Sequence, residues 1–334
     1  MVQEQANSEA GQLWMQMDDG ASLFIRRWEA ERPEALLHII HGMAEHSGRY
    51  DRLARRLGKE GIEVWAADQR GHGETALNKQ NSPGQGGLLG HCADGDGFSR
   101  VCKDIDIINR EIVKERPGVP LFLLGHSWGS FIAQSYIENF EGLSRRSHRV
   151  TLAGCILSGT RGPEAMPGGI KMALGVPFMG LMAFLLGQRK GSMKVKNALD
   201  GSYNKSFRPN RTGFDWLSRD EQEVDAYLAD PLCGFLCSTG FYRDMTRALG
   251  RIHRKDEMNK IRKELPVYIF SGNADPVGDM GESHAALAVA YRHLEIKDLE
   301  TVLYPDARHE TLNETNRDEV IESLVSWLHR HCNT

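Results

Sequence analysis

The sequence predicts an α/β fold with a mostly parallel sheet, helices on both faces of that sheet, and one long insertion. Short apolar runs alternate with helix-like stretches in both halves of the chain, which is typical of a parallel sheet covered on both faces. This alternation stops between about residues 160 and 263. The 334 residues exceed one ordinary domain, so we expect a single α/β domain that is split by the insertion.

The first half of the chain supplies most of the predicted sheet. Its strand candidates are residues 22–28, 35–40, 62–67, 121–125 and 151–157. Its helix candidates are residues 50–59, 98–115 and 128–139. The run at 35–40 is apolar enough for a strand that is buried on both sides. In the second helix Ile105, Ile108 and Ile112 share one face, and Pro117 follows its end.

After the insertion the alternation of strands and helices resumes. Strands are expected at 266–271 and 300–304, and helices at 283–293 and 318–331. We therefore predict an α/β core formed by residues 1–159 and 263–334, with a helical cap, or lid, at 160–262. The apolar run at 172–187 is shorter than a bilayer-spanning helix requires and contains Pro177, so we do not expect it to cross a membrane.

Composition excludes several classes of protein. The net charge is −4 and the isoelectric point is near 6.4, whereas nucleic-acid-binding proteins carry a basic excess, so we expect no nucleic-acid partner. The six cysteines are scattered, which is typical of a reducing compartment. A secretory signal peptide has a basic start followed by an apolar stretch, and the first residues do not show this pattern. We expect a cytoplasmic protein, either free or peripheral to a membrane; nothing in the sequence predicts its oligomeric state.

The candidate nucleophile is Ser127, at the centre of the G-x-S-x-G motif Gly125-His126-Ser127-Trp128-Gly129. The motif is short, and a glycine-rich turn that happens to contain a serine would also match it. Its context favours catalysis, because a buried strand leads directly in and a helix leads directly out. Such a strand-to-helix elbow exposes the serine oxygen at the carboxyl edge of the sheet.

A serine hydroxyl needs a base, and the base needs a carboxylate to orient it. In this architecture the chain order is serine, acid, histidine. His309 follows a late strand, whereas the other late histidines lie on predicted helices; a solvated loop histidine is the alternative interpretation. Asp275, on the loop after strand 266–271, is our preferred acid, and Asp306 and Asp279 are its competitors.

An oxyanion hole requires two backbone N–H groups. One is expected from Trp128, which follows the nucleophile, and the other from the loop after strand 35–40, where Gly42 makes the Met43 N–H the candidate donor. A plain turn at the end of a strand would also explain His41-Gly42. The elbow and the late acid and base favour the catalytic interpretation of this loop.

Together these motifs resemble the α/β-hydrolase family, and more narrowly its monoacylglycerol lipase and lysophospholipase group. The matching segments are HGMAEHSGRY (41–50), ADQRGHGET (67–75), LLGHSWGS (123–130), SGNADPV (271–277) and PDARHETLNE (305–314). The resemblance implies a Ser127–Asp275–His309 triad, with Met43 and Trp128 as oxyanion donors. It also implies a cap that covers an acyl pocket.

The resemblance extends to the head-group side of the site, where Glu45 and Arg49 match polar residues of the family; a local ion pair would explain them equally well. Two positions depart from the family pattern. Thr75 stands where serine is frequent, and Leu312 stands where mammalian-type monoglyceride lipases have a histidine.

The cap carries a methionine-rich apolar stretch at 166–186, which suits either an adaptable acyl channel or ordinary packing. The cations that follow it are Arg189, Lys190, Lys194 and Lys196. An apolar element flanked by cations could contact an anionic membrane surface transiently, although a solvated charged face is the more frequent arrangement. Cys233 and Cys237 lack further metal ligands at a suitable spacing, and we expect neither a metal nor an organic cofactor.

The sequence therefore predicts a serine carboxylic-ester hydrolase that cleaves a monoacyl lipid, either a monoacylglycerol or a lysophospholipid. An aminopeptidase or small-ester hydrolase on the same scaffold is the first alternative. An aminopeptidase would need carboxylates of the cap to point inward. The candidates are Asp220, Glu221, Glu223 and Asp225, which cluster like a solvated helix face. The second alternative is a non-catalytic ligand-binding protein of the same fold.

Overall fold

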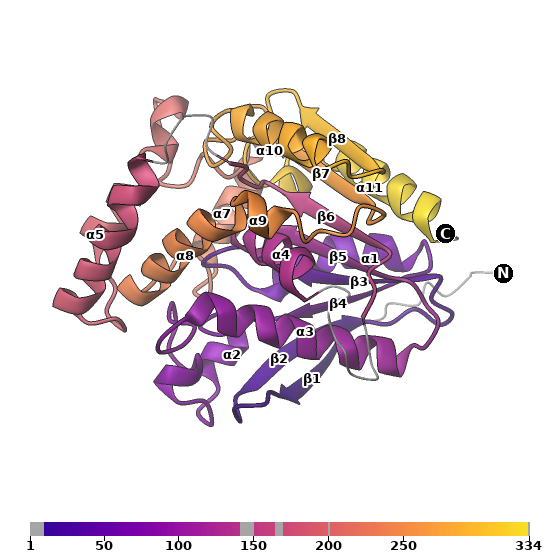
Figure 1. Cartoon of the computed structure of the whole chain (residues 1–334), viewed down its shortest axis with the longest axis horizontal. Coiled ribbons are helices and arrows are strands. Elements are labelled where there is room, and N and C mark those ends of the chain that lie inside the picture. The colour runs from indigo at the N-terminus through magenta and orange to yellow at the C-terminus, as the bar shows by residue number, and fades with distance from the viewer. Residues whose placement is uncertain (1–9, 141–149, 164–169, 200, 333–334) are drawn as a thin grey trace.

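A computed structural model describes residues 10–140, 150–163, 170–199 and 201–332, without the side chains of 170–176 (Figure 1). Its centre is an eight-stranded sheet in the order β1-β2-β4-β3-β5-β6-β7-β8. The strands are β1 (Gly11–Gln16), β2 (Ser22–Trp28), β3 (Ala35–Ile40), β4 (Ile62–Ala67), β5 (Leu121–His126), β6 (Gly154–Ser158), β7 (Val267–Gly272) and β8 (Leu299–Tyr304). The structure thus confirms all seven predicted strands, within a few residues at their ends.

The six strands β3 to β8 pair in parallel, whereas β2 pairs antiparallel with both of its neighbours, β1 and β4. Strand β3 lies between β4 and β5, so that Leu37 pairs with Val64 on one side and with Phe122 on the other. The carboxyl ends of parallel strands meet at one edge of a sheet, where loops bring functional groups together. The loops after β3, β5, β7 and β8 therefore lie together at this edge.

Helices cover both faces of the sheet, as the sequence predicts (Figure 1). Successive residues of each buried strand point to opposite faces. Leu123 packs on the side of α3 (Gly97–Glu115), α4 (Trp128–Asn139) and α10 (Glu282–His293). Its neighbour Phe122 packs on the side of α1 (Asp51–Gly58) and α11 (Arg317–His331), 5.7 Å from Trp327 between ring centroids. The short helix α2 (Gly73–Leu77) follows β4.

The described part of the segment between β6 and β7 contains helices and turns and no strand, in agreement with the predicted break in the alternation. Its helices are α5 (Ile170–Leu186), α6 (Met193–Leu199), α7 (Glu221–Ala229), α8 (Thr239–Ile252) and α9 (Lys255–Met258). Helix α5 packs against α8 at the side of the molecule (Figure 1). Below we call residues 160–262 the inserted segment. Of the helices that the structure describes, none is both long and apolar enough to cross a bilayer.

One strand differs from the sequence interpretation. Strand β1 was not predicted, because its residues are mostly exposed at the sheet edge and lack a buried apolar run. It is held by antiparallel pairing with β2, where the rings of Trp14 and Phe24 lie 5.3 Å apart. The apolar run of the inserted segment forms one helix, with Pro177 inside it. Met166 and the side chain of Met172 lie outside the described residues.

Candidate active site

Ser127 lies at the tight turn between β5 and α4. Its backbone has φ 52° and ψ −121°, a conformation that a non-glycine residue adopts only under strain. The flanking glycines make the turn sterically feasible. A Cβ on Gly125 would lie 2.4 Å from the Gly129 carbonyl oxygen, and a Cβ on Gly129 would lie 2.0 Å from the Ile40 carbonyl oxygen. The structure therefore forms the strand-to-helix elbow that the G-x-S-x-G motif predicts.

His309 and Asp275 come together although 34 residues separate them. The Nδ1 atom of His309 lies 2.9 Å from Oδ2 of Asp275, and both side chains are almost fully buried. Oδ1 of Asp275 accepts a hydrogen bond of 2.8 Å from the Val277 N–H. The loops after β7 and β8 thus supply an acid and a histidine that are already paired.

The protonation of this pair follows from its surroundings. Burial opposes the charge of Asp275, but the adjacent His309 lowers the pKa of the carboxyl below its usual value. Burial likewise opposes a charge on His309, but Asp275 raises the pKa of the imidazole above 6.5. An ionised carboxylate only accepts hydrogen bonds, so Nδ1 of His309 carries the proton. Its Nε2 then remains available as a base.

Neither of the two competing carboxylates contacts His309. Asp279 forms an ion pair of 2.8 Å with Arg161. Asp306 is exposed in a turn with φ 58°, and its N–H donates to Asn273. Of the three candidate acids, Asp275 is therefore the one that contacts His309.

The loop after β3 brings Met43 to the elbow. Met43 and Ser127 line the same two cavities, and no acceptor within the described residues takes the Met43 N–H. Trp128 is the first residue of α4, where backbone N–H groups lack partners inside the helix. The two predicted oxyanion donors therefore come from separate elements that both adjoin the serine.

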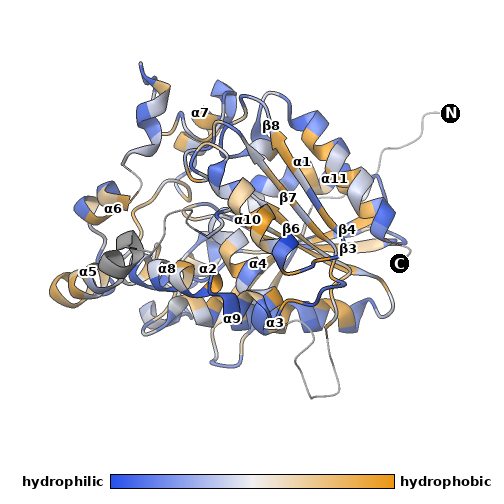
Figure 2. Ribbon diagram, turned by 45° about the horizontal axis from the view of Figure 1, so that its top comes forward, coloured by the Kyte–Doolittle hydropathy of each residue, from blue (hydrophilic) through white to orange (hydrophobic). Residues whose placement is uncertain are grey.

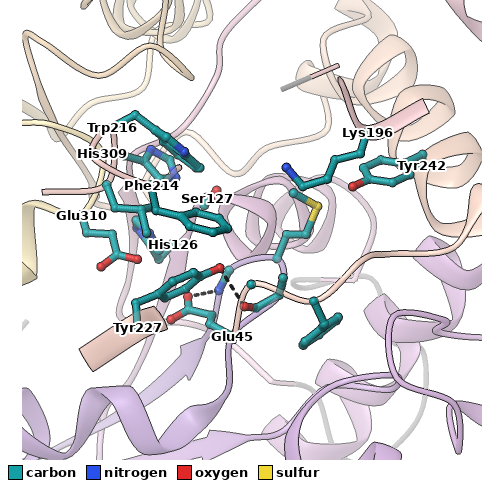
Figure 3. Close-up of a pocket in the computed structure, with 16 residues that line it drawn as sticks. Glu45, His126, Ser127, Lys196, Phe214, Trp216, Tyr227, Tyr242, His309 and Glu310 are labelled. Carbon is teal, nitrogen blue, oxygen red and sulfur yellow. Dashed lines mark hydrogen bonds between the residues drawn. The ribbon is translucent and has the colours of Figure 1, made fainter. Parts of the chain in front are cut away.

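Two cavities of different size meet at Ser127. The larger, about 500 Å³, is lined mainly by apolar side chains from α4, α5, α6 and α8, including Phe131, Met179 and Leu249. In the smaller, about 40 Å³, the side chains of Glu45, Glu310 and Lys196 lie among aromatic and aliphatic ones, next to His309 (Figure 3). The site therefore offers one reacting group a large apolar space and a small space with charged side chains in its wall.

The two carboxylates of the smaller cavity belong to a buried ion-pair network. Arg49 binds both oxygens of Glu310, at 2.6 and 2.7 Å, and one oxygen of Glu45 at 2.9 Å. The other Glu45 oxygen accepts hydrogen bonds from the Gly42 N–H and from Tyr50. Burial alone would raise the pKa of Glu45, but mainly Arg49 lowers it to about 2.

Glu45 and Arg49 thus form the local ion pair that was the alternative to head-group binding, although Glu45 also lines the smaller cavity. Sequence reasoning missed Glu310. It lies 261 residues from Arg49, and its position beside the candidate base His309 is the only sequence signal that could have drawn attention to it.

His46, Asp230 and Cys233 place potential metal-ligating atoms within 4.8 Å of one another. Their hydrogen bonds argue against a metal. Nδ1 of His46 accepts the Gly48 N–H, so a neutral ring carries its proton on Nε2 and donates it to Asp230 at 2.8 Å. Neither ring nitrogen then has an unused lone pair, and burial raises the pKa of the Cys233 thiol, which disfavours the thiolate that a metal requires.

Comparison with known proteins places this arrangement in a family. The family model described as "Serine aminopeptidase, S33" matches residues 31–316. The chain belongs to this family. Within it, the chain is a monoglyceride lipase-like α/β hydrolase, as the motifs predicted.

Relatives support the narrower grouping. A putative monoglyceride lipase of Schizosaccharomyces pombe is 35% identical over 322 residues, covering 93% of this chain and 72% of the relative. A monoacylglycerol lipase of Mycolicibacterium smegmatis is 26% identical over 301 residues, covering 90% of this chain and 89% of the relative. The chain spans only 28% of the length of a matching uncharacterized abhydrolase domain-containing protein of Dictyostelium discoideum.

A carboxyl esterase of Bacillus coagulans shares the fold of this α/β hydrolase. Its structure superimposes with a TM-score of 0.83 at 24% identity and covers 98% of this chain and 100% of its own. The eight-stranded sheet and its helices are therefore the architecture of the family.

The first testable prediction concerns the ion-pair network. Arg49→Met leaves two buried carboxylates without their cation, so we expect a loss of about 3–5 kcal/mol in the free energy of unfolding at pH 7, measured by urea titration. Arg52→Met is the control, because Arg52 is 44% exposed and pairs with Glu223 at the surface; its loss should stay below about 1 kcal/mol. Equal losses in the two variants would contradict the network's role.

Proposed function

We propose that this protein is a serine hydrolase that cleaves the ester of a monoacyl lipid, a monoacylglycerol or a lysophospholipid, through an acyl-enzyme intermediate. One observation carries the proposal: Ser127 lies where a large, mainly apolar cavity meets a small one that contains His309 and the charged side chains of Glu45 and Glu310. An acyl chain suits the first cavity, whose volume lies within the usual range for ligand pockets. In the second cavity, the charged side chains suit contact with a hydroxyl group of the leaving alcohol.

In the first half of the proposed reaction, Nε2 of His309 takes the proton of Ser127 as its oxygen attacks the ester carbonyl. The Met43 and Trp128 N–H groups stabilise the negative charge that develops on the carbonyl oxygen. The imidazolium is stabilised by Asp275 and then gives its proton to the departing alcohol. This step breaks the ester C–O bond and leaves the acyl group on Ser127.

In the second half, His309 takes a proton from water, and the resulting nucleophile attacks the acyl carbonyl. The same oxyanion donors act again. Collapse of the tetrahedral intermediate returns the proton to Ser127 and releases the fatty acid. No step requires a metal or an organic cofactor.

Head-group recognition must differ from that of relatives with a histidine at position 312. Leu312 is 7% exposed, packs in the core with α11, and lines neither cavity. We therefore assign contact with the alcohol to the carboxylates in the wall of the smaller cavity, Glu45 and Glu310.

The aminopeptidase alternative draws on the family's description, but the carboxylates do not favour it. Within the described residues, Asp220, Glu223 and Asp225 pair with Arg317, Arg52 and Arg211, and none of the four cap carboxylates considered above lines either cavity at Ser127. Glu45 and Glu310 do lie there, but Arg49 already occupies the position between them that a substrate ammonium group would need.

We further propose that the inserted segment, acting as a cap over the site, contacts a membrane surface through α5. Its exposed apolar side chains include Phe178, Leu181, Phe184 and Leu185, of which Phe184 is 83% exposed. Figure 2 shows the hydrophobic colour along much of the α5 ribbon. Arg189, Lys190 and Lys194 follow and are also exposed. Apolar side chains beside cations suit the interface of an anionic bilayer. This contact would hold a cytoplasmic enzyme next to its lipid substrate.

The nucleophile is tested with Ser127→Ala and a substrate panel of monoacylglycerols, lysophospholipids and amino-acid amides. We expect turnover of the monoacyl lipids by the wild type and a loss of ~10³–10⁶-fold in the variant. Ser99→Ala on α3 is the control and should match the wild type. Turnover of the amides alone would favour the aminopeptidase. Failure of a fluorophosphonate probe to label Ser127 would favour the non-catalytic alternative.

The pH profile tests the Asp275–His309 pair. His309 must be neutral to act as a base, so kcat/KM should fall as the pH decreases through its pKa, which lies above 6.5. Asp275→Asn removes the charge that raises this pKa. The acid limb should then move to lower pH, and the plateau should drop ~10⁴-fold. Asp306→Asn should leave the acid limb and the plateau unchanged. If Asp306→Asn instead shifted the limb and lowered the plateau while Asp275→Asn did neither, Asp306 would be the acid.

Membrane contact is tested by cosedimentation with vesicles of phosphatidylcholine and phosphatidylglycerol. Replacing Phe184 and Leu185 with serine should reduce the bound fraction at least about fivefold, because two exposed apolar side chains leave the interface. Turnover of a water-soluble p-nitrophenyl ester should not change. Trp14→Ser, at an exposed apolar residue on β1, is the control. Undiminished binding of the double variant would refute the contact.

A further inference from the structure

The loop that carries Met43 is held in a conformation that it would not adopt alone. Ala44 has φ 55°, in the left-handed region that costs a residue with a Cβ conformational energy. Residues in such regions keep their conformation only where their surroundings hold them. The contacts of this loop therefore decide where the Met43 N–H points.

One short stretch of the inserted segment, residues 227–234, supplies several of these contacts. The Tyr227 hydroxyl and the Gly234 N–H both donate to the Ala44 carbonyl oxygen, each at 2.9 Å. Asp230, between them, accepts the hydrogen bond from Nε2 of His46 at 2.8 Å. Figure 3 shows the Tyr227 hydroxyl directed at this loop from below Ser127.

The start of the same loop is held by the core of the protein. The Gly42 N–H donates to the Glu45 carboxylate, which Arg49 and Tyr50 fix in turn. The His41–Gly42 peptide is thus held from the core, and the Ala44–Glu45 peptide is held from the inserted segment. The Gly42–Met43 peptide, which carries the Met43 N–H, lies between them, and its Gly42 carbonyl oxygen accepts a hydrogen bond of 2.8 Å from Nδ1 of His41. The dihedrals of Met43 and Ala44 connect this peptide to the anchor in the inserted segment.

Tyr227 is itself held firmly. It is 6% exposed, and the Arg49 guanidinium lies 4.8 Å from the centre of its ring. Loss of its hydroxyl would leave the ring in place and remove one of the two hydrogen bonds to Ala44. The hydroxyl can therefore be tested separately from packing.

We propose that Tyr227 is a positioning residue of the oxyanion hole: through the Ala44 carbonyl it aims the Met43 N–H at the reacting oxygen. The inference rests on the proposed function, since it assigns Met43 the role of oxyanion donor. It makes the inserted segment part of the catalytic geometry as well as a cover for the substrate.

The test is Tyr227→Phe, compared with Tyr291→Phe. Tyr291 is buried in α10, and its hydroxyl has no hydrogen-bond partner among the described residues. In Tyr227→Phe we expect kcat to fall about 5- to 100-fold, less than the loss of a whole oxyanion donor, with KM within about twofold of the wild type. Affinity for a long-chain trifluoromethyl ketone, whose adduct with Ser127 carries an oxyanion, should fall by the same factor. Tyr291→Phe should change neither quantity.

A second variant covers the case in which Tyr227→Phe does not fold. Asp230→Ala removes the neighbouring contact with His46, and the Asp230 side chain is 32% exposed, so the fold should tolerate the change. It should lower kcat and ketone affinity together.

Two outcomes would overturn the inference. One is wild-type kcat and ketone affinity in the folded variant. The other is a raised KM with unchanged kcat, which would make Tyr227 a head-group contact. Fluorophosphonate labelling of Ser127 in the same preparations separates this failure from failure of the proposed function, because unlabelled wild-type enzyme would refute the function itself.

Discussion

The close approach of α4 to the end of β3 is the constraint on which the rest of the site depends. Gly129 has no side chain, and the Ile40 carbonyl occupies the space that a Cβ would fill. This contact places the first turn of α4 against the strand that leads into the Met43 loop. Ser127, in its strained conformation at the start of α4, therefore shares its cavities with Met43. The parallel strands β7 and β8 end at the same edge and bring Asp275 and His309.

The sequence was most informative where one local pattern determines one local structure. Buried apolar runs located seven strands, and the glycines around Ser127 located the elbow. The pairing of His309 with Asp275 could be predicted because strand ends meet at one edge. Strand β1 escaped prediction because its residues face solvent. Glu310 and Tyr227 escaped because their partners, Arg49 and Ala44, lie 261 and 183 residues away, and no local pattern reports such pairings.

The inserted segment contacts two of the loops that form the site. Residues 227–234 hold the Met43 loop, while the carbonyl oxygens of Trp216 and Leu217 accept the N–H groups of His309 and Glu310. The Trp216 ring also lies 5.1 Å from the His309 ring. Our division into core and cap separates stretches of sequence, but the geometry of the site depends on both.

The Glu45–Arg49–Glu310 network has a consequence for how this protein can evolve. Two buried carboxylates from the two ends of the chain share one guanidinium, so loss of Arg49 leaves both without their cation, whereas loss of one carboxylate leaves the other paired. Replacement of Arg49 alone is therefore the costly change, and a joint replacement of all three residues by apolar ones leaves no carboxylate unpaired. Lineages should thus lose Arg49 only together with Glu45 and Glu310, and a lineage that lost all three would have no carboxylate beside its serine.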